Sequence, residues 1–129
     1  MNIAAIQTEL GRRLAPVAEH VYINPPASPS YPCAIVHFPF IETFHLDLAH
    51  GVTRTSWEVS LAAGRGDVDE SYSVIAEWLS DGTPTSVRDA LEAKRTEATP
   101  WLRLALASST PPQIGADSAE VTLTIQIDS

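Results

Sequence analysis

Two stretches of the chain alternate hydrophobic and polar residues with the period of two that is typical of half-buried strands. In the first stretch, Trp57, Val59 and Leu61 alternate with two serines and a glutamate. The second stretch closes the chain, and its apolar positions are Val121, Leu123, Ile125 and Ile127. We therefore predict two strands, each with one face turned toward a hydrophobic core.

The N-terminal stretch has the 3.6-residue period of an amphipathic helix. One helical face carries the apolar residues Ile3, Ile6, Leu10, Leu14 and Val17. Asn2 is a suitable N-cap, because its side chain can accept a hydrogen bond from a first-turn amide. Pro16 should end the helix near Ala15, since proline lacks the amide hydrogen and restricts the residue before it.

A second amphipathic helix should follow the strand that contains Trp57. The glycines in 64–66 allow a tight turn, and Asp67 with Glu70 three residues later has the spacing of a capping box. The apolar positions that follow share one helical face: Val68, Tyr72, Ile75 and Leu79. We predict that this face packs against Trp57 and Leu61 of the strand.

The remaining hydrophobic pattern indicates shorter strands and a hairpin. Strands are expected at 19–23 and 101–107, and the near-continuous apolar run at 33–38 predicts a strand covered on both faces. Residues 40–48 and 52–63 should form a hairpin. The hairpin is expected to be long and protruding, because polar residues occur on both sides near its tip.

Turn-forming residues divide these elements. Segments rich in Pro and Ser or Gly at 24–32 and 108–117 are expected to be loops, and Thr85 or Ser86 should begin a short helix. The sum is a single α+β domain over residues 1–129. It consists of a mixed or antiparallel β-sheet with two to three helices packed on one face and a protruding β-hairpin.

Charge narrows the classes of function. The chain has 16 acidic and 8 basic residues, for a formal net charge of −8. Such a chain is poorly suited to grip nucleic-acid phosphates, which requires clustered Lys and Arg. No apolar run has the roughly 18 to 20 residues of a membrane span, and residues 1–13 lack the pattern of a signal peptide. Cys33, the one cysteine, is expected to be a small buried core residue.

The candidate chemistry is sparse. His45, Asp47 and His50 are residues of metal-ligand type, but a third ligand is unassigned and no zinc motif is matched, so we interpret them as a polar hairpin face. The glycines in 64–66 lack the rest of a dinucleotide or phosphate-binding motif. No serine has the context of a nucleophile. We predict no catalytic residues, no metal and no cofactor, and hence no enzyme.

The order of segments along the chain is similar to that of a known protein family. A Pro-rich INPPASPSYPCAIV segment is followed by a hairpin ending in SWEVSLAAGRGDVDESYSVIAEWLSD, then by GTPTSVRDALEA and a closing AEVTLTIQID strand. This arrangement resembles the tail terminator (tail-completion) proteins of long-tailed bacteriophages, especially those of actinobacterial hosts. The likeness covers essentially the whole chain, and its most telling parts are LAAGRGDVDESY and GTPTSVRDALEA, which are structural motifs.

The resemblance implies an α+β subunit of a homo-hexameric ring at the head–tail junction of the virion, made in the host cytoplasm. Such a ring caps the last ring of tail-tube protein, stops tube elongation and offers a docking face to the head–tail connector or stopper protein. Double-stranded DNA passes through its lumen without sequence-specific binding, and no membrane is involved. The family has no catalytic residues, so none is carried over.

The hairpin supplies the candidate assembly interface, because an arm longer than its sheet requires is suited to contact a partner. The residues concerned are Phe40, Phe44, His45, His50 and Arg54. Two other classes of function remain open. The second is that the chain is another head–tail joining or minor tail structural protein. In the third, it is a small ligand-binding domain or enzyme of α+β fold, since fold does not determine function.

Overall fold

The computed structural model describes residues 2–47, 52–64, 68–92, 103–115 and 118–128, with the backbone alone at 42–47, 52–53, 68–69 and 103. The helices are α1 (Ile3–Leu14), α2 (Val68–Leu79) and α3 (Val87–Leu91). The strands are β1 (His20–Ile23), β2 (Cys33–Val36), β3 (Phe40–Asp47), β4 (Val52–Gly64), β5 (Arg103–Ser109), β6 (Gln113–Ile114) and β7 (Ser118–Asp128).

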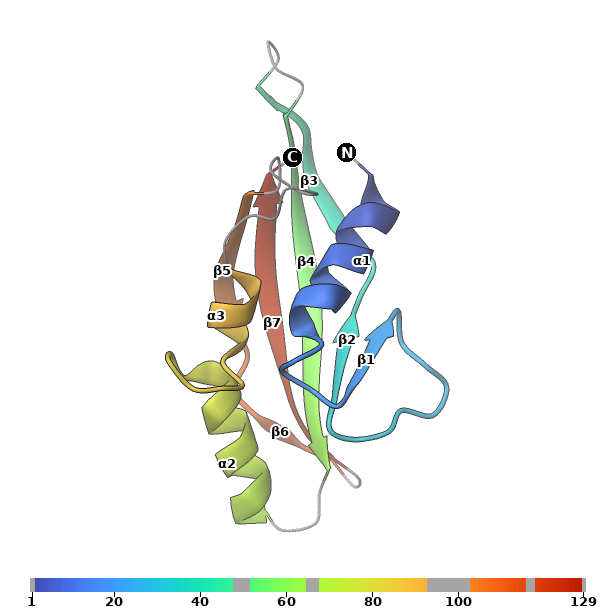
Figure 1. The fold of residues 1–129 in the computed structure, drawn as a ribbon. Helices are drawn as coiled ribbons and strands as arrows, with labels where there is room; N and C mark the ends of the chain where they lie inside the picture. Colours follow the sequence, from blue (N-terminus) through green and yellow to red (C-terminus); the bar gives the residue numbers. More distant parts are fainter. Residues whose placement is uncertain (1, 48–51, 65–67, 93–102, 116–117, 129) are drawn as a thin grey trace.

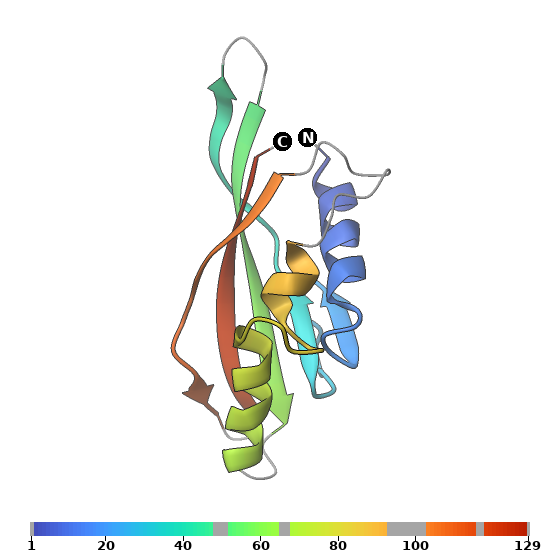
Figure 2. The same ribbon diagram turned by 60° about the vertical axis from the view of Figure 1, so that its left-hand side comes forward.

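The strands form one mixed sheet in the order β1-β2-β4-β7-β5, with β3 also paired to β4 and β6 also paired to β7. Strands β1 and β2 are parallel, and the other pairs are antiparallel. The three helices lie on the same face of this sheet (Figures 1 and 2). The predicted α+β class is therefore confirmed, with the sheet of the mixed kind.

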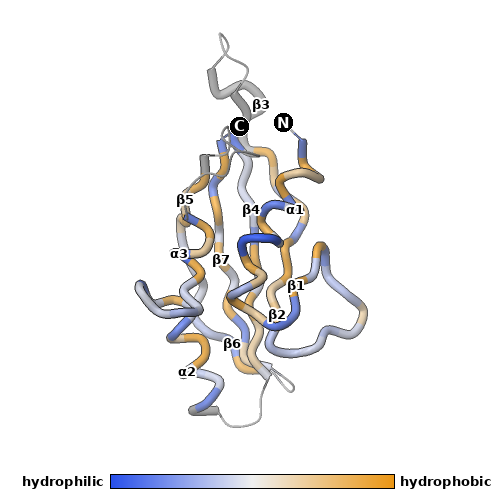
Figure 3. The backbone as a smooth tube through the Cα atoms, in the orientation of Figure 1, coloured by the Kyte–Doolittle hydropathy of each residue, from blue (hydrophilic) through white to orange (hydrophobic). Residues whose placement is uncertain are grey.

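The long ladder between β4 and β7 forms the centre of the sheet. It runs without a register shift from Arg54 opposite Asp128 to Gly64 opposite Ser118. Because side chains alternate between faces, the odd-numbered residues of both strands point toward the helices. On β7 the helix-facing residues Val121, Leu123, Ile125 and Ile127 are fully buried, as predicted, and Figure 3 shows the alternation in hydropathy along this strand.

Helix α1 begins and ends as its sequence predicts. The Asn2 side chain caps it by accepting a hydrogen bond of 3.1 Å from the amide of Ala5. The helix ends at Leu14, two residues before Pro16. Its apolar face is buried against the sheet, with Ile6 and Leu10 fully enclosed.

Helix α2 exposes a different face from the one predicted. Tyr72 and Leu79 are 42% and 40% exposed, whereas Ser71 and Trp78 are buried together with Ile75. The predicted packing of Leu79 against the β4 strand is therefore wrong. Trp78 explains the rotation, because its indole N–H donates a hydrogen bond of 3.1 Å to the carbonyl of Val17 and the ring fills the core.

Two further expectations required correction. Strand β2 ends at Val36, and Phe38, which was expected to be covered, is 67% exposed. The segment 108–117 was expected to be a loop, but β5 continues to Ser109 and residues 113–114 form β6. Both departures occur at an edge of the sheet and depend on strand pairing. Strand β2 ends at Val36, whereas residues 108–109 and 113–114 pair with β7.

A partly buried ion pair within α1 positions Arg13, which joins this helix to α3. Glu9 accepts hydrogen bonds from Arg12, at 2.6 and 3.0 Å, and from Arg13 Nε, at 3.0 Å. Arg13 Nη1 also donates to the carbonyl oxygen of Leu91 at 2.6 Å. The hydrogen bond from Arg12, supported by Arg13 and opposed by burial, lowers the pKa of Glu9 from 4.5 to about 2.

Truncation of the central packing should be costly. Leu61→Ala and Ile75→Ala each remove a buried side chain between β4 and α2, so we expect the free energy of unfolding to fall by about 2–5 kcal/mol. Chemical denaturation measures this change. Leu79→Ala is the matched control, because Leu79 lies on the same helix and is 40% exposed. A loss below about 0.5 kcal/mol for Ile75→Ala would contradict the observed packing.

The ion pair of Glu9 predicts a pH dependence. The folded pKa of Glu9 lies below its usual value of 4.5, so its stabilisation is complete above about pH 4.5 and is lost as the pH falls toward 2. Glu9→Gln should lower the free energy of unfolding by about 1–3 kcal/mol at neutral pH, and by less near pH 2. Denaturation at several pH values checks this. Glu19→Gln is the control, since the Glu19 side chain is 71% exposed, and an unchanged pH profile for Glu9→Gln would refute the expectation.

Candidate assembly interface

The hairpin of β3 and β4 extends past the end of the sheet (Figures 1 and 2). Strand β7 ends at Asp128, opposite Arg54, while β4 begins two residues earlier at Val52. Within the described residues, β3 pairs with β4 alone, and its register shifts twice between Ile41 and Asp47. The hairpin was predicted to be long and protruding, and the structure has this form.

An ion pair fixes the base of the hairpin. Arg54 donates to both carboxylate oxygens of Asp128, at 2.9 and 3.0 Å, in the two-bond geometry that suits a guanidinium. One residue further along β4, Thr55 donates to the carbonyl of Ile127 at 3.2 Å and accepts the indole N–H of Trp57 at 2.7 Å. Arg54, a predicted interface residue, thus holds the arm to β7.

The chain bulges where β2 passes into β3. Val36 lies opposite Val59, and Phe40 lies opposite Ser56. The chain therefore advances four residues from β2 to β3 while β4 advances three. One extra residue on an edge strand is a β-bulge, which can turn a side chain outward. Pro39 is buried within the bulge, while Phe38 and Phe40 are 67% and 70% exposed.

These two phenylalanines are the most exposed large hydrophobic side chains that the structure describes. Phe40 was a predicted interface residue; it is exposed, and its role in a contact stays a prediction. The exposure of Phe38 was not predicted. The sequence signal that could have indicated it is Pro39, which separates Phe38 from Phe40 and interrupts an otherwise buried apolar run. The side chains of Phe44 and His45 and all of His50 lie outside the described residues, so their contacts stay predictions.

No known protein family has a model that matches this chain, and a search of curated proteins gives no significant match.

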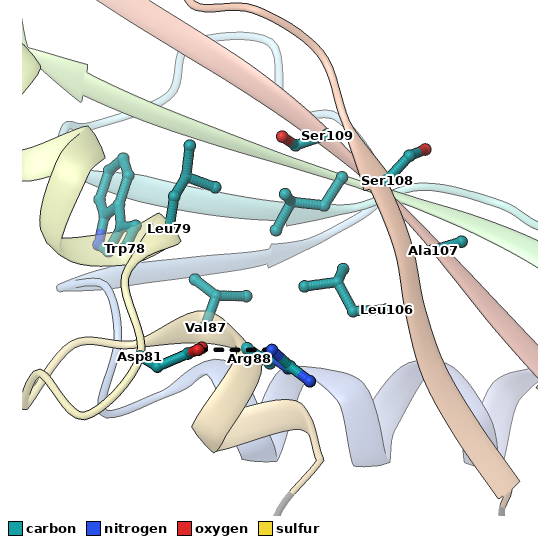
Figure 4. A pocket seen from close by; sticks show the side chains of 10 residues that line it. Trp78, Leu79, Asp81, Val87, Arg88, Leu106, Ala107, Ser108 and Ser109 are labelled. Carbon is teal, nitrogen blue, oxygen red and sulfur yellow. Dashed lines mark hydrogen bonds and ion pairs between the residues drawn. The ribbon is translucent and has the colours of Figure 1, made fainter.

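A cleft lies at the opposite edge of the sheet, between α2, α3 and β5 (Figure 4). Its volume is about 280 Å³, several times the roughly 30 Å³ of one water molecule. Trp78, Leu79, Val87 and Leu106 border a common space, and the ion pair of Arg88 with Asp81, at 3.4 Å, closes one side. Sequence periodicity did not predict this cleft, because it depends on which face α2 exposes.

Strand β5 has its own irregularity beside the cleft. Leu106 lies opposite Ile125 and Ser108 lies opposite Thr124, so Ala107 is an extra residue. Arg88 also donates to Glu92 at 3.1 Å, and Glu92 accepts the amide hydrogen of Leu106 at 3.4 Å. These contacts tie α3 to the edge strand β5.

Other polar side chains have structural roles. His37 Nε2 lies 2.8 Å from the hydroxyl of Ser60 on the sheet face away from the helices. Cys33 is fully buried, as expected. Within the described residues there is no group of three or more His, Cys, Asp or Glu side chains arranged to hold a metal ion. Likewise, no described helix has the length and hydropathy to span a membrane.

Phe40 should be dispensable for folding. Because its side chain is 70% exposed, Phe40→Ser should change the free energy of unfolding by no more than about 0.5 kcal/mol. Trp57, which follows the residue opposite Phe40 on β4, is buried and serves as the comparison. Trp57→Ala should lower the free energy of unfolding by about 3–5 kcal/mol. Denaturation of the two variants side by side would decide. A large loss for Phe40→Ser would place Phe40 in the core instead of at a contact surface.

Proposed function

We propose that this protein is the tail-terminator subunit of a long-tailed bacteriophage, which caps the tail tube as a hexameric ring. One observation carries the proposal: the β3–β4 hairpin projects beyond the sheet and has exposed aromatic residues at its base. Before Arg54, strand β4 extends past the end of its ladder with β7. The hairpin is suited to contact a neighbouring subunit or the ring of tail-tube protein.

The sheet edges support a ring. A closed ring of identical subunits requires two different lateral surfaces on each subunit, which meet head to tail. Here β1 and β3 lie on one side of the β4–β7 pair, and β5 and β6 lie on the other. The two sides differ in shape, since one presents an aromatic bulge and the other a cleft. A subunit whose two lateral surfaces differ in this way is suited to head-to-tail contacts in a ring.

Charge supports a role beside DNA without binding to it. The sheet face away from the helices carries mainly hydroxyl and amide side chains along β7: Thr122, Thr124 and Gln126. Glu58 and Glu120 on the same face are exposed, and Arg54 is neutralised by Asp128. With a net charge of −8 for the chain, a lumen built from such subunits would repel phosphates and let the genome slide.

Shortening the hairpin tests the proposal. Thr43 and Arg54 are paired across it, so a two-residue Asn-Gly turn can replace residues 44–53. The shortened protein should fold, since little core packing is removed. Supplied to a phage that lacks the gene, it should leave tails uncapped and of irregular length, as measured by electron microscopy. The matched control keeps the full length but replaces Phe44, His45 and His50 by serine or threonine, which separates arm length from side-chain chemistry.

Three results would count against the proposal. Normal tail lengths with the shortened protein would show that the arm has no part in capping. A layer at the end of the tube with a symmetry other than six-fold would exclude the hexameric ring. Capture of the connector protein but not the tail-tube protein in a pull-down would instead favour another head–tail joining protein.

A further inference from the structure

We infer that Phe38 and Phe40 of one subunit insert into the cleft between α2, α3 and β5 of a second copy of this chain. This inference rests on the proposed function, since it specifies how ring subunits meet. The two phenylalanines would occupy the cleft, and the bulge would hold them in position to do so. The contact is heterologous, because each subunit gives the aromatic pair at one edge and receives it at the other.

The aromatic pair is the donor. Phe38 and Phe40 flank the buried Pro39 at the β2–β3 bulge, with exposures of 67% and 70%. Together they leave on the order of 250 Å² of aromatic surface in water. An exposed apolar patch of this kind marks an interaction surface more often than an isolated residue does. The bulge holds both side chains away from their own core.

The cleft is a chemically suitable acceptor. Apolar side chains from three elements form part of its lining, Trp78 and Leu79 from α2, Val87 from α3 and Leu106 from β5, and polar residues that include Ser108 and Ser109 form the rest. Leu79 is 40% exposed, so a wall of the cleft also remains in contact with water. Arg88, the cation among the described residues that line the cleft, is neutralised by Asp81 and Glu92. The space is open at the edge of the sheet.

The arrangement favours a second copy over an unrelated partner. The bulge and the cleft lie on opposite sides of the β4–β7 pair. When such a donor and acceptor belong to the same chain, each added copy leaves a free donor at one end and a free acceptor at the other. A suitable rotation between copies then closes a ring.

The available area is adequate. A standard interface buries about 800 Å² per partner, of which about 57%, or roughly 450 Å², is non-polar. The two phenylalanines supply about half of that apolar area on the donor side. The walls of the cleft and the adjoining strand edges are available for the remainder.

Disulfide capture tests the contact directly. Phe38→Cys places a thiol on the donor, and Ser109→Cys places one at the exposed rim of the cleft. We expect a mixture of the two single variants to form a mixed disulfide dimer under oxidation, and the double variant to form a ladder of longer oligomers. The native Cys33 should not compete, because burial and the nearby Glu120 carboxylate raise the pKa of its thiol.

A matched pair of substitutions on α2 provides the second readout. Leu79→Ser removes a wall of the cleft, whereas Tyr72→Ser changes a residue of similar exposure, 42% against 40%, that does not line it. We expect Leu79→Ser to weaken self-association about tenfold, the loss of one apolar anchor, and Tyr72→Ser to leave it unchanged. Sedimentation of folded protein, verified by its circular dichroism spectrum, gives the comparison.

The inference is overturned if the mixture gives only homodimers of each variant, which would indicate a symmetric contact, or if it gives no disulfide at all. Equal effects of Leu79→Ser and Tyr72→Ser would also overturn it. These results leave the proposed function standing if the shortened hairpin still disrupts tail length. Conversely, a positive mixed disulfide with normal tails in the hairpin experiment would keep the contact and remove the assigned role.

Discussion

The antiparallel ladder between β4 and β7 is the constraint on which the rest of the structure depends. Its unbroken register makes every helix-facing residue of both strands point the same way. The apolar side chains on that face are fully buried beneath the helices: Trp57, Val59, Leu61, Val121, Leu123, Ile125 and Ile127. A slip of one residue would carry this set to the open face, so the hydrophobic pattern fixes both the register and the face on which the helices pack.

The projecting hairpin follows from the unequal lengths of the two central strands. Strand β7 ends opposite Arg54, and the hairpin beyond that point has no neighbour from β7. The ion pair of Arg54 with Asp128 closes the last rung and gives the arm a fixed base. An arm with a fixed base suits contact with another chain, which is why we propose this role for the hairpin.

The helices are held to one another by polar contacts as well as by the core. Arg13 connects Glu9 of α1 to the Leu91 carbonyl at the end of α3, and Trp78 of α2 donates to the Val17 carbonyl beyond α1. These contacts set the rotation and spacing of short helices whose own propensity is modest. The cleft beside α2 is a consequence, because the rotation that buries Trp78 leaves Leu79 facing the bulged β5 strand.

The sequence by itself determined the α+β class, the N-terminal helix with its Asn2 cap, the central and closing strands and the hairpin. In each of these, a period of two or 3.6 persists for many residues and a turn or cap residue marks the end. It also predicted Phe40 and the hairpin as an assembly interface, and of this the structure shows that Phe40 is exposed. Only the tertiary structure decided which stripe of α2 is buried, because two stripes share Ile75 and the choice depended on a hydrogen bond from Trp78 to a distant carbonyl. The same holds for the cleft, which depends on the rotation of α2. It also holds for Phe38, which lies at a bulge on the sheet edge, where pairing with a neighbouring strand, not local periodicity, determines which way a side chain points.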